Sequence, residues 1–127
     1  MSFLAPCSIG EIFDKITILE IKEKKINDKI KLSNIKKELQ LLKDLVNKIN
    51  SQVEVINSVN ELRLVNEQLW DIEDELRILE KSQQFDGKFI QLARSVYITN
   101  DKRSAIKKQI NILTGSAIVE EKSYDYL

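Results

Sequence analysis

Polar residues occupy the middle of an otherwise apolar helix face near the C-terminus of this 127-residue chain. At spacings of three and four, that face carries in order Phe89, Leu92, Val96, Thr99, Arg103, Ile106, Ile110 and Leu113. Asn100 and Lys107 flank the same face. A guanidinium is almost never buried alone, because an unpaired buried charge costs several kcal/mol. Arg103 must therefore meet a carboxylate, an anionic ligand or water.

Two local geometries are open for this segment. In the first, the helix continues and its inner face carries four polar residues: Thr99, Asn100, Arg103 and Lys107. In the second, Thr99 and Asn100 cap a new helix that has Asp101 in its first turn. Free backbone N–H groups beside Lys102 and Arg103 would then form an anion site. Asp101 joins the site only in the second geometry.

The first predicted helix offers charged partners at the same height. In an up-down-up-down bundle the first and last helices run antiparallel. A rise of about 1.5 Å per residue then places Arg103 level with residues 14–16 and Thr99 level with residues 19–20. The expected polar pocket comprises Asp14, Lys15, Glu20, Thr99, Asn100, Arg103 and Lys107. Such a pocket suits proton transfer or anion binding, and the alternative is an ion-pair network that only fixes helix register.

Acidic pairs on the helices suggest a second kind of chemistry. The pairs are Glu11 with Asp14, Glu20 with Glu23, and Asp71 with Asp74. Carboxylates on helices hold Mg²⁺ in helical nucleotide pyrophosphohydrolases. Pairs of this kind arise readily among twenty acidic residues, and the chain has no histidine, the commonest metal ligand and general base. We therefore expect a solvated acidic face, with no metal and no cofactor.

Composition narrows the class of protein. Twenty basic and twenty acidic residues cancel, which argues against a nucleic-acid partner. No apolar run has the length of a membrane span, and the N-terminus lacks the pattern of a signal peptide. The single cysteine, Cys7, excludes an intrachain disulfide. These features predict a cytoplasmic protein that does not enter a membrane.

Capping signals divide a long helical span. Between Gly10 and Gly87 there is neither glycine nor proline, which favours helix throughout. The sequence has capping boxes at residues 8–11 and 58–61, a cap at residues 33–34 and an N-cap at Asp86. These signals predict four helices, over about 9–31, 34–56, 58–81 and 87–114. A non-helical tail follows over 116–127. The third helix has the most regular seam: Leu62, Val65, Leu69, Ile72, Leu76 and Leu79.

The fold class is therefore all-α, in a single helical domain. The arrangement is either an antiparallel bundle of about four helices or an elongated coiled-coil hairpin that completes its core by forming a homo-oligomer. The apolar spacing near Asn57 leaves open whether the second and third helices form one rod.

Four segments carry a resemblance to a known family. They are residues 8–20, 93–103, 110–111 and 120–124. Together they resemble a small uncharacterised family of bacterial and phage proteins, whose genes often lie among those for cell-surface polysaccharide or glycosyl transfer. The resemblance assigns to the family pattern Asp14, Lys15, Thr17, Asn100, Asp101, Lys102 and Arg103. It implies no activity.

Three functional hypotheses follow. The first is binding of an anionic small ligand, a phosphorylated sugar or a nucleotide, between the first and last helices, with catalysis left open. The second is a non-enzymatic coiled-coil oligomer or adaptor in which the polar residues only set register. The third is a nucleotide hydrolase that uses carboxylate-bound Mg²⁺. The candidate ligand-binding residues are Asp14, Lys15, Glu20, Thr99, Asn100, Asp101, Lys102, Arg103 and Lys107.

Overall fold

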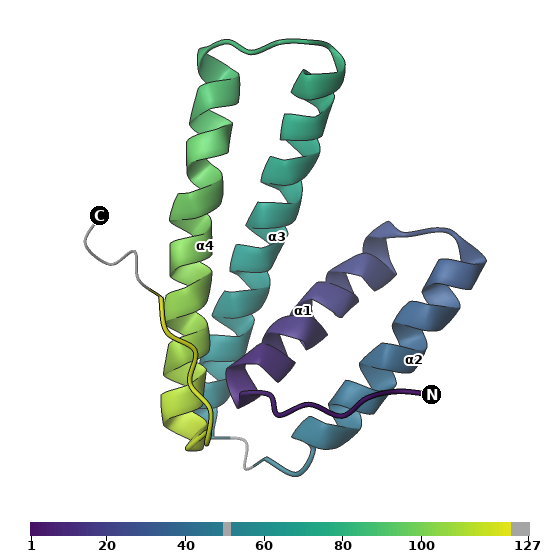
Figure 1. Cartoon of the computed structure of the whole chain (residues 1–127), viewed down its shortest axis with the longest axis vertical. Helices are drawn as coiled ribbons and strands as arrows, with labels where there is room; N and C mark the ends of the chain where they lie inside the picture. The colour runs from purple at the N-terminus through teal and green to yellow at the C-terminus, as the bar shows by residue number, and fades with distance from the viewer. Residues whose placement is uncertain (50–51, 123–127) are drawn as a thin grey trace.

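The described part of the chain forms four α-helices arranged as two hairpins. The computed structural model describes residues 1–49 and 52–122. The helices are α1 (Ile9–Lys25), α2 (Lys29–Val46), α3 (Val53–Lys81) and α4 (Gly87–Thr114). The α1–α2 and α3–α4 hairpins diverge from a common base, as Figure 1 shows. The chain is thus an all-α bundle of antiparallel neighbours, which is one of the two arrangements that the sequence left open.

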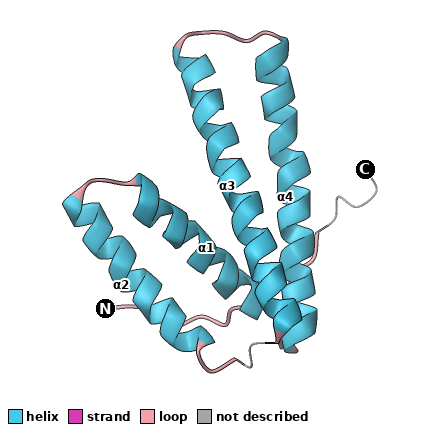
Figure 2. Cartoon of the chain, turned by 180° about the vertical axis from the view of Figure 1, so that it is seen from behind, coloured by secondary structure: helices cyan, strands magenta, loops and turns pink. Residues whose placement is uncertain are grey.

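The base of the molecule is where the two hairpins meet. There α1 packs against both α3 and α4, whereas α2, within the described residues, packs against α1 alone. From behind, in Figure 2, the long α3–α4 hairpin extends well beyond α1 and α2. Polar residues at the start of α1 are therefore the ones that are brought against α3 and α4.

Apolar side chains bury two successive interfaces. Ile16 and Leu19 of α1 pack with Ile35 and Leu39 of α2. The buried apolar residues of the second hairpin are Val55, Leu62, Val65, Leu69, Leu79 and Ile110. Burial of a side chain of this size stabilises the fold by about 1.5–3 kcal/mol, so α1 is held on one face by α2 and on the other by the long hairpin. In the described part of the chain, no helix is long and apolar enough to cross a membrane.

The first helix ends earlier than predicted. It stops at Lys25 rather than near residue 31, and Ile26 adopts an extended conformation. The side chain of Asp28 then accepts a hydrogen bond from the backbone N–H of Lys31 at 2.9 Å, which caps α2. The predicted cap at residues 33–34 lies inside α2. Asp28 was not predicted as a cap, because the apolar pattern of the sequence continues through this turn.

The boundary between the second and third helices was also placed incorrectly. Helix α2 ends at Val46 rather than at residue 56, and α3 begins at Val53. The capping box at residues 58–61 therefore lies within α3. Val55 and Leu62, seven residues apart on one face, are both buried, and their packing outweighs the local capping preference. The two helices are separate rather than one rod.

The last helix runs without a break. Asp86 accepts a hydrogen bond from the backbone N–H of Lys88 at 3.2 Å, and Gly115 ends the helix in the left-handed region with φ 66°. Thr99 and Asn100 are helical, so the alternative in which they cap a new helix is wrong. Residues 116–122 leave α4 without helical structure and run back along it (Figure 1). The remainder of the predicted tail lies outside the described residues.

Candidate functional site

Asp14 is the centre of a buried polar cluster at the base. Asp14, Thr17 and Ile21, spaced three and four apart, share the face of α1 that is directed away from α2, and all three are buried. The Asp14 carboxylate accepts hydrogen bonds from both Nε and Nη2 of Arg103, the former at 2.9 Å. This is the paired-fork geometry in which arginine binds carboxylates most strongly. The first geometry expected for Arg103, a continuous helix with a partner on α1, is the one present.

Asn66 of α3 completes the shell around Asp14. Its Nδ2 donates to Asp14 Oδ1 at 3.0 Å and to Thr17 Oγ1 at 2.8 Å. The Thr17 hydroxyl in turn donates to the Asp14 carbonyl at 2.8 Å. The sequence reading missed Asn66. A signal was present, since Leu62, Asn66 and Leu69 are spaced four and three apart and share one helix face.

A second cation lies one helical turn beyond Arg103. Lys107 Nζ pairs with Glu11 and lies 3.9 Å from Asp14 Oδ2. The hydrogen bond from the Asp14 carboxylate raises the pKa of Arg103 above its usual value, although burial alone would lower that pKa. Arg103 and Lys107 are thus two fixed positive charges, each held from behind by a carboxylate of α1.

The C-terminal segment is fastened to the start of α1 by hydrogen bonds. Glu120 accepts from the hydroxyl of Ser8 and, at 3.1 Å, from the side-chain amide of Asn111. The Asn111 side-chain oxygen accepts from the Gly10 backbone N–H at 2.6 Å, and Ser116 Oγ accepts from the Ile9 N–H at 3.1 Å. Three of the segments that carry the resemblance, residues 8–20, 110–111 and the start of 120–124, therefore meet at one place.

Two neighbouring groups have pKa values shifted by this arrangement. Burial would raise the pKa of Glu120, but the hydrogen bonds from Ser8, its own backbone and Asn111 hold that pKa below its ordinary value of 4.5. Burial, and then the charge of Glu11, raise the pKa of the Cys7 thiol. Glu120 is therefore a stable anion near neutral pH, and Cys7 is a poor thiolate nucleophile.

An open pocket of about 410 Å³ lies between α4 and the C-terminal segment. Its lining residues are Asn100, Arg103, Ser104, Lys107, Glu120 and Lys122. Small-molecule sites commonly have volumes of about 300–1,000 Å³. Three cations and one carboxylate line this pocket, so its wall carries a net positive charge.

The structure brings together five of the nine candidate residues and separates the other four. Asp14 lies behind the pocket, which Asn100, Arg103 and Lys107 line directly. Thr99 is buried in the same region.

The other candidates lie elsewhere. Lys15 is exposed on α1, and Glu20 pairs with Arg63 of α3 at 3.1 Å rather than meeting α4. Lys102 lines a separate, mainly apolar depression between α3 and α4. Asp101 is exposed and pairs with Lys122 at 2.9 Å, so it touches the pocket only through that lysine.

The acidic pairs do not converge. Within residues 1–49 and 52–122, no three histidine, cysteine or carboxylate side chains lie together as a metal site would require. Glu11 and Asp14 are instead neutralised by Lys107 and Arg103. The carboxylates of α1 therefore serve as counter-ions to the two cations of α4.

Comparison with known proteins identifies one family. No curated protein and no solved structure matches the chain. A family of unknown function (DUF6165) matches residues 5–126, a span that includes the whole polar cluster and the pocket. The chain therefore belongs to the DUF6165 family.

Proposed function

We propose that the pocket between α4 and the C-terminal segment binds a small anionic molecule, either a phosphorylated sugar or a nucleotide. The observation that carries the proposal is its lining, in which Arg103, Lys107 and Lys122 face a single carboxylate, Glu120. Asn100 and Ser104 add neutral hydrogen-bonding groups. A phosphate oxygen accepts hydrogen bonds from all of these donors.

The two cations of α4 are held in place before any ligand arrives. Arg103 uses Nε and Nη2 for Asp14, and its Nη1 has no partner among the described residues. The Arg103 side chain keeps 29% of its surface exposed, whereas that of Lys107 keeps 18%. A fixed side chain loses little conformational freedom on binding, which favours affinity. The carboxylates behind the cations thus hold them in place, although Asp14 and Glu11 offset the charges of Arg103 and Lys107.

A phosphate group would gain most from the two lysines and from Arg103 Nη1. Lys122 lines the pocket from the C-terminal segment, and it pairs with Asp101 on the exposed side of α4. That ion pair is solvent-exposed and contributes about 1 kcal/mol at most.

Thermal unfolding with a panel of ligands tests the proposal. Glucose 6-phosphate and adenosine monophosphate are compared with glucose and adenosine, which lack the phosphate. A bound ligand at ten times its Kd stabilises the fold by about 1.4 kcal/mol, which raises Tm by about 5 °C for a chain of this length. We expect a shift only with phosphorylated compounds.

Two lysine variants make the test specific. Lys122→Gln removes a pocket cation, whereas Lys108→Gln removes a lysine that also pairs α4 with the C-terminal segment, through Glu121 at 2.9 Å, but does not line the pocket. We expect Lys122→Gln to weaken binding about five- to tenfold and Lys108→Gln to leave it unchanged. Equal losses in both variants, or no shift in the wild type, would overturn the proposal.

A non-enzymatic homo-oligomer is a second candidate. Large apolar side chains are exposed along the α3–α4 hairpin: Leu64, Ile78, Ile90 and Ile98. Exposed apolar surface on a long helical hairpin is suited to association with another hairpin. Light scattering across a range of protein concentrations checks this candidate, and a monomer at all concentrations would reject it.

A further inference from the structure

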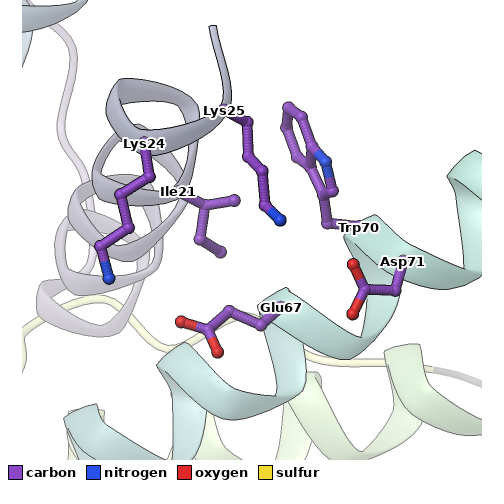
Figure 3. A pocket seen from close by; sticks show the side chains of 6 residues that line it. All are labelled: Ile21, Lys24, Lys25, Glu67, Trp70 and Asp71. Atoms are coloured by element: carbon purple, nitrogen blue, oxygen red, sulfur yellow. The ribbon is translucent and has the colours of Figure 1, made fainter.

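A second pocket lies between the two hairpins, on the opposite side of α3 from α4. Its volume is about 190 Å³ and its lining residues are Ile21, Lys24 and Lys25 of α1 with Glu67, Trp70 and Asp71 of α3 (Figure 3). None of these residues belongs to the Asp14 cluster or to the pocket beside Lys122. This volume is below the range of about 300–1,000 Å³ that is common for small-molecule sites, so the pocket suits a small ligand.

Charges of both signs face one another across this pocket without pairing. Lys24 and Lys25 stand on one wall, and Glu67 and Asp71, four residues apart on α3, stand on the other. Within the described residues, no lysine nitrogen of this pocket lies within 4.0 Å of a carboxylate oxygen. Figure 3 shows the Lys25 ammonium and the Asp71 carboxylate directed into the space between α1 and α3. The charged groups of this pocket are therefore not paired with one another.

The net charge of the pocket lining indicates which kind of ligand it can bind. Two cations and two carboxylates sum to zero, unlike the net positive lining of the other pocket. A simple anion would be attracted by the lysines but repelled by Glu67 and Asp71. A simple cation would be attracted by the two carboxylates but repelled by the lysines. A molecule that carries both charges gains on both walls, since each of its ends forms a charge-assisted hydrogen bond.

An apolar surface completes the pocket. Ile21 is only 3% exposed, and the half-buried Trp70 stands on the other side of the Lys25 side chain in Figure 3. An aromatic face offers a large contact area to an apolar group. The pocket thus combines cationic, anionic and apolar walls, which is the arrangement common in specific small-molecule sites.

We infer that this pocket binds a small zwitterion with an apolar part, chemically an α-amino acid with an aliphatic side chain. The ligand carboxylate pairs with Lys24 and Lys25, its ammonium with Glu67 and Asp71, and its side chain lies against Trp70 and Ile21. This inference does not rest on the anion pocket, because the two sites share no residue.

The fluorescence of Trp70 tests the inference directly. Trp70 is the only tryptophan of the chain, so its emission reports on this pocket alone. The probe is leucine, compared with N-acetyl-leucine, which lacks the ammonium, with leucinamide, which lacks the carboxylate, and with glucose. We expect a saturable change in emission with leucine and binding at least about tenfold weaker for each analogue that lacks one charge.

Variants then test which charged side chains bind leucine. Asp71→Asn and Lys25→Gln are each expected to weaken leucine binding about tenfold. Asp74→Asn, a neighbouring acid on α3 that does not line the pocket, and Lys122→Gln at the other site are expected to leave it unchanged. The inference is overturned if leucine gives no saturable change, if N-acetyl-leucine or glucose binds as well as leucine, or if Asp74→Asn weakens binding as much as Asp71→Asn.

Discussion

Replacing Asp14 with asparagine removes the charge around which the base of the molecule is organised. The Asp14 carboxylate is fully buried and accepts hydrogen bonds from Arg103 and Asn66. Asparagine has nearly the same shape but presents an amide NH₂ in place of one carboxylate oxygen. That NH₂ faces donors of Arg103 or Asn66, so at least one hydrogen bond is replaced by a contact between two donors.

The expected cost follows from the partners that remain. Breaking a buried ion pair by removing one member costs about 3–5 kcal/mol. Two features place Asp14→Asn at the lower end of that range. Water reaches Arg103, whose side chain is 29% exposed, and Lys107 keeps its pair with Glu11. We therefore expect a loss of about 3 kcal/mol in the free energy of unfolding, which lowers Tm by about 10 °C.

Urea denaturation followed by far-ultraviolet circular dichroism measures this loss. Asp74→Asn, on the exposed side of α3 and without an ion pair among the described residues, is the matched control and should change stability by less than about 0.5 kcal/mol. Combining Asp14→Asn with Arg103→Met removes both charges, and the double variant should cost about 2 kcal/mol less than the sum of the single variants. A loss below about 1 kcal/mol for Asp14→Asn, or strict additivity, would refute the reasoning.

Two further predictions concern the contacts that hold the start of α1 against α4 and the C-terminal segment. In Gly10→Ala the new Cβ would lie 2.5 Å from the carbonyl oxygen of Lys107, so the variant should lose about 1–3 kcal/mol although alanine favours helix. Gly87→Ala, where nothing lies within 4 Å, should not be destabilised, and denaturant titration compares the two variants. Because the pKa of Glu120 is lowered on folding, its charge stabilises the fold above the unfolded pKa near 4.5, and this contribution is lost as pH falls through the lower folded value. Glu120→Gln should therefore be less stable than wild type near neutral pH, and the difference should vanish in acid; a difference that grows in acid would contradict this.

The sequence was informative at both ends of α4, where the helix boundary depends on local chemistry. Asp86 and Gly115 bound α4 because a side-chain N-cap and a left-handed glycine act over one turn. The start of α3 was not readable in this way, since Gln52 makes no side-chain capping hydrogen bond. There the burial of Val55 against distant residues, which no local pattern records, decides where the helix begins.

Part of the site could be predicted from the regular geometry of the helices. Counting the rise along two antiparallel helices placed Arg103 level with Asp14, and the two side chains pair. The same count failed for Glu20, because α1 inclines away from α4 along its length (Figure 1) and brings Glu20 to Arg63 of α3. The position of Glu120 could not be anticipated either, since the path of a non-helical segment leaves no periodic signal in the sequence. Asn111 lies on α4, and only the resemblance over residues 110–111 pointed to it.

Calorimetric titration of the wild-type protein with glucose 6-phosphate tests the central claim most directly. The account predicts saturable binding that is absent with glucose, that weakens as salt is added because phosphate–cation attraction is screened, and that is reduced about five- to tenfold by Lys122→Gln but not by Lys108→Gln. If neither glucose 6-phosphate nor adenosine monophosphate binds, or if binding ignores both salt and Lys122→Gln, the pocket beside Arg103 is not an anion site.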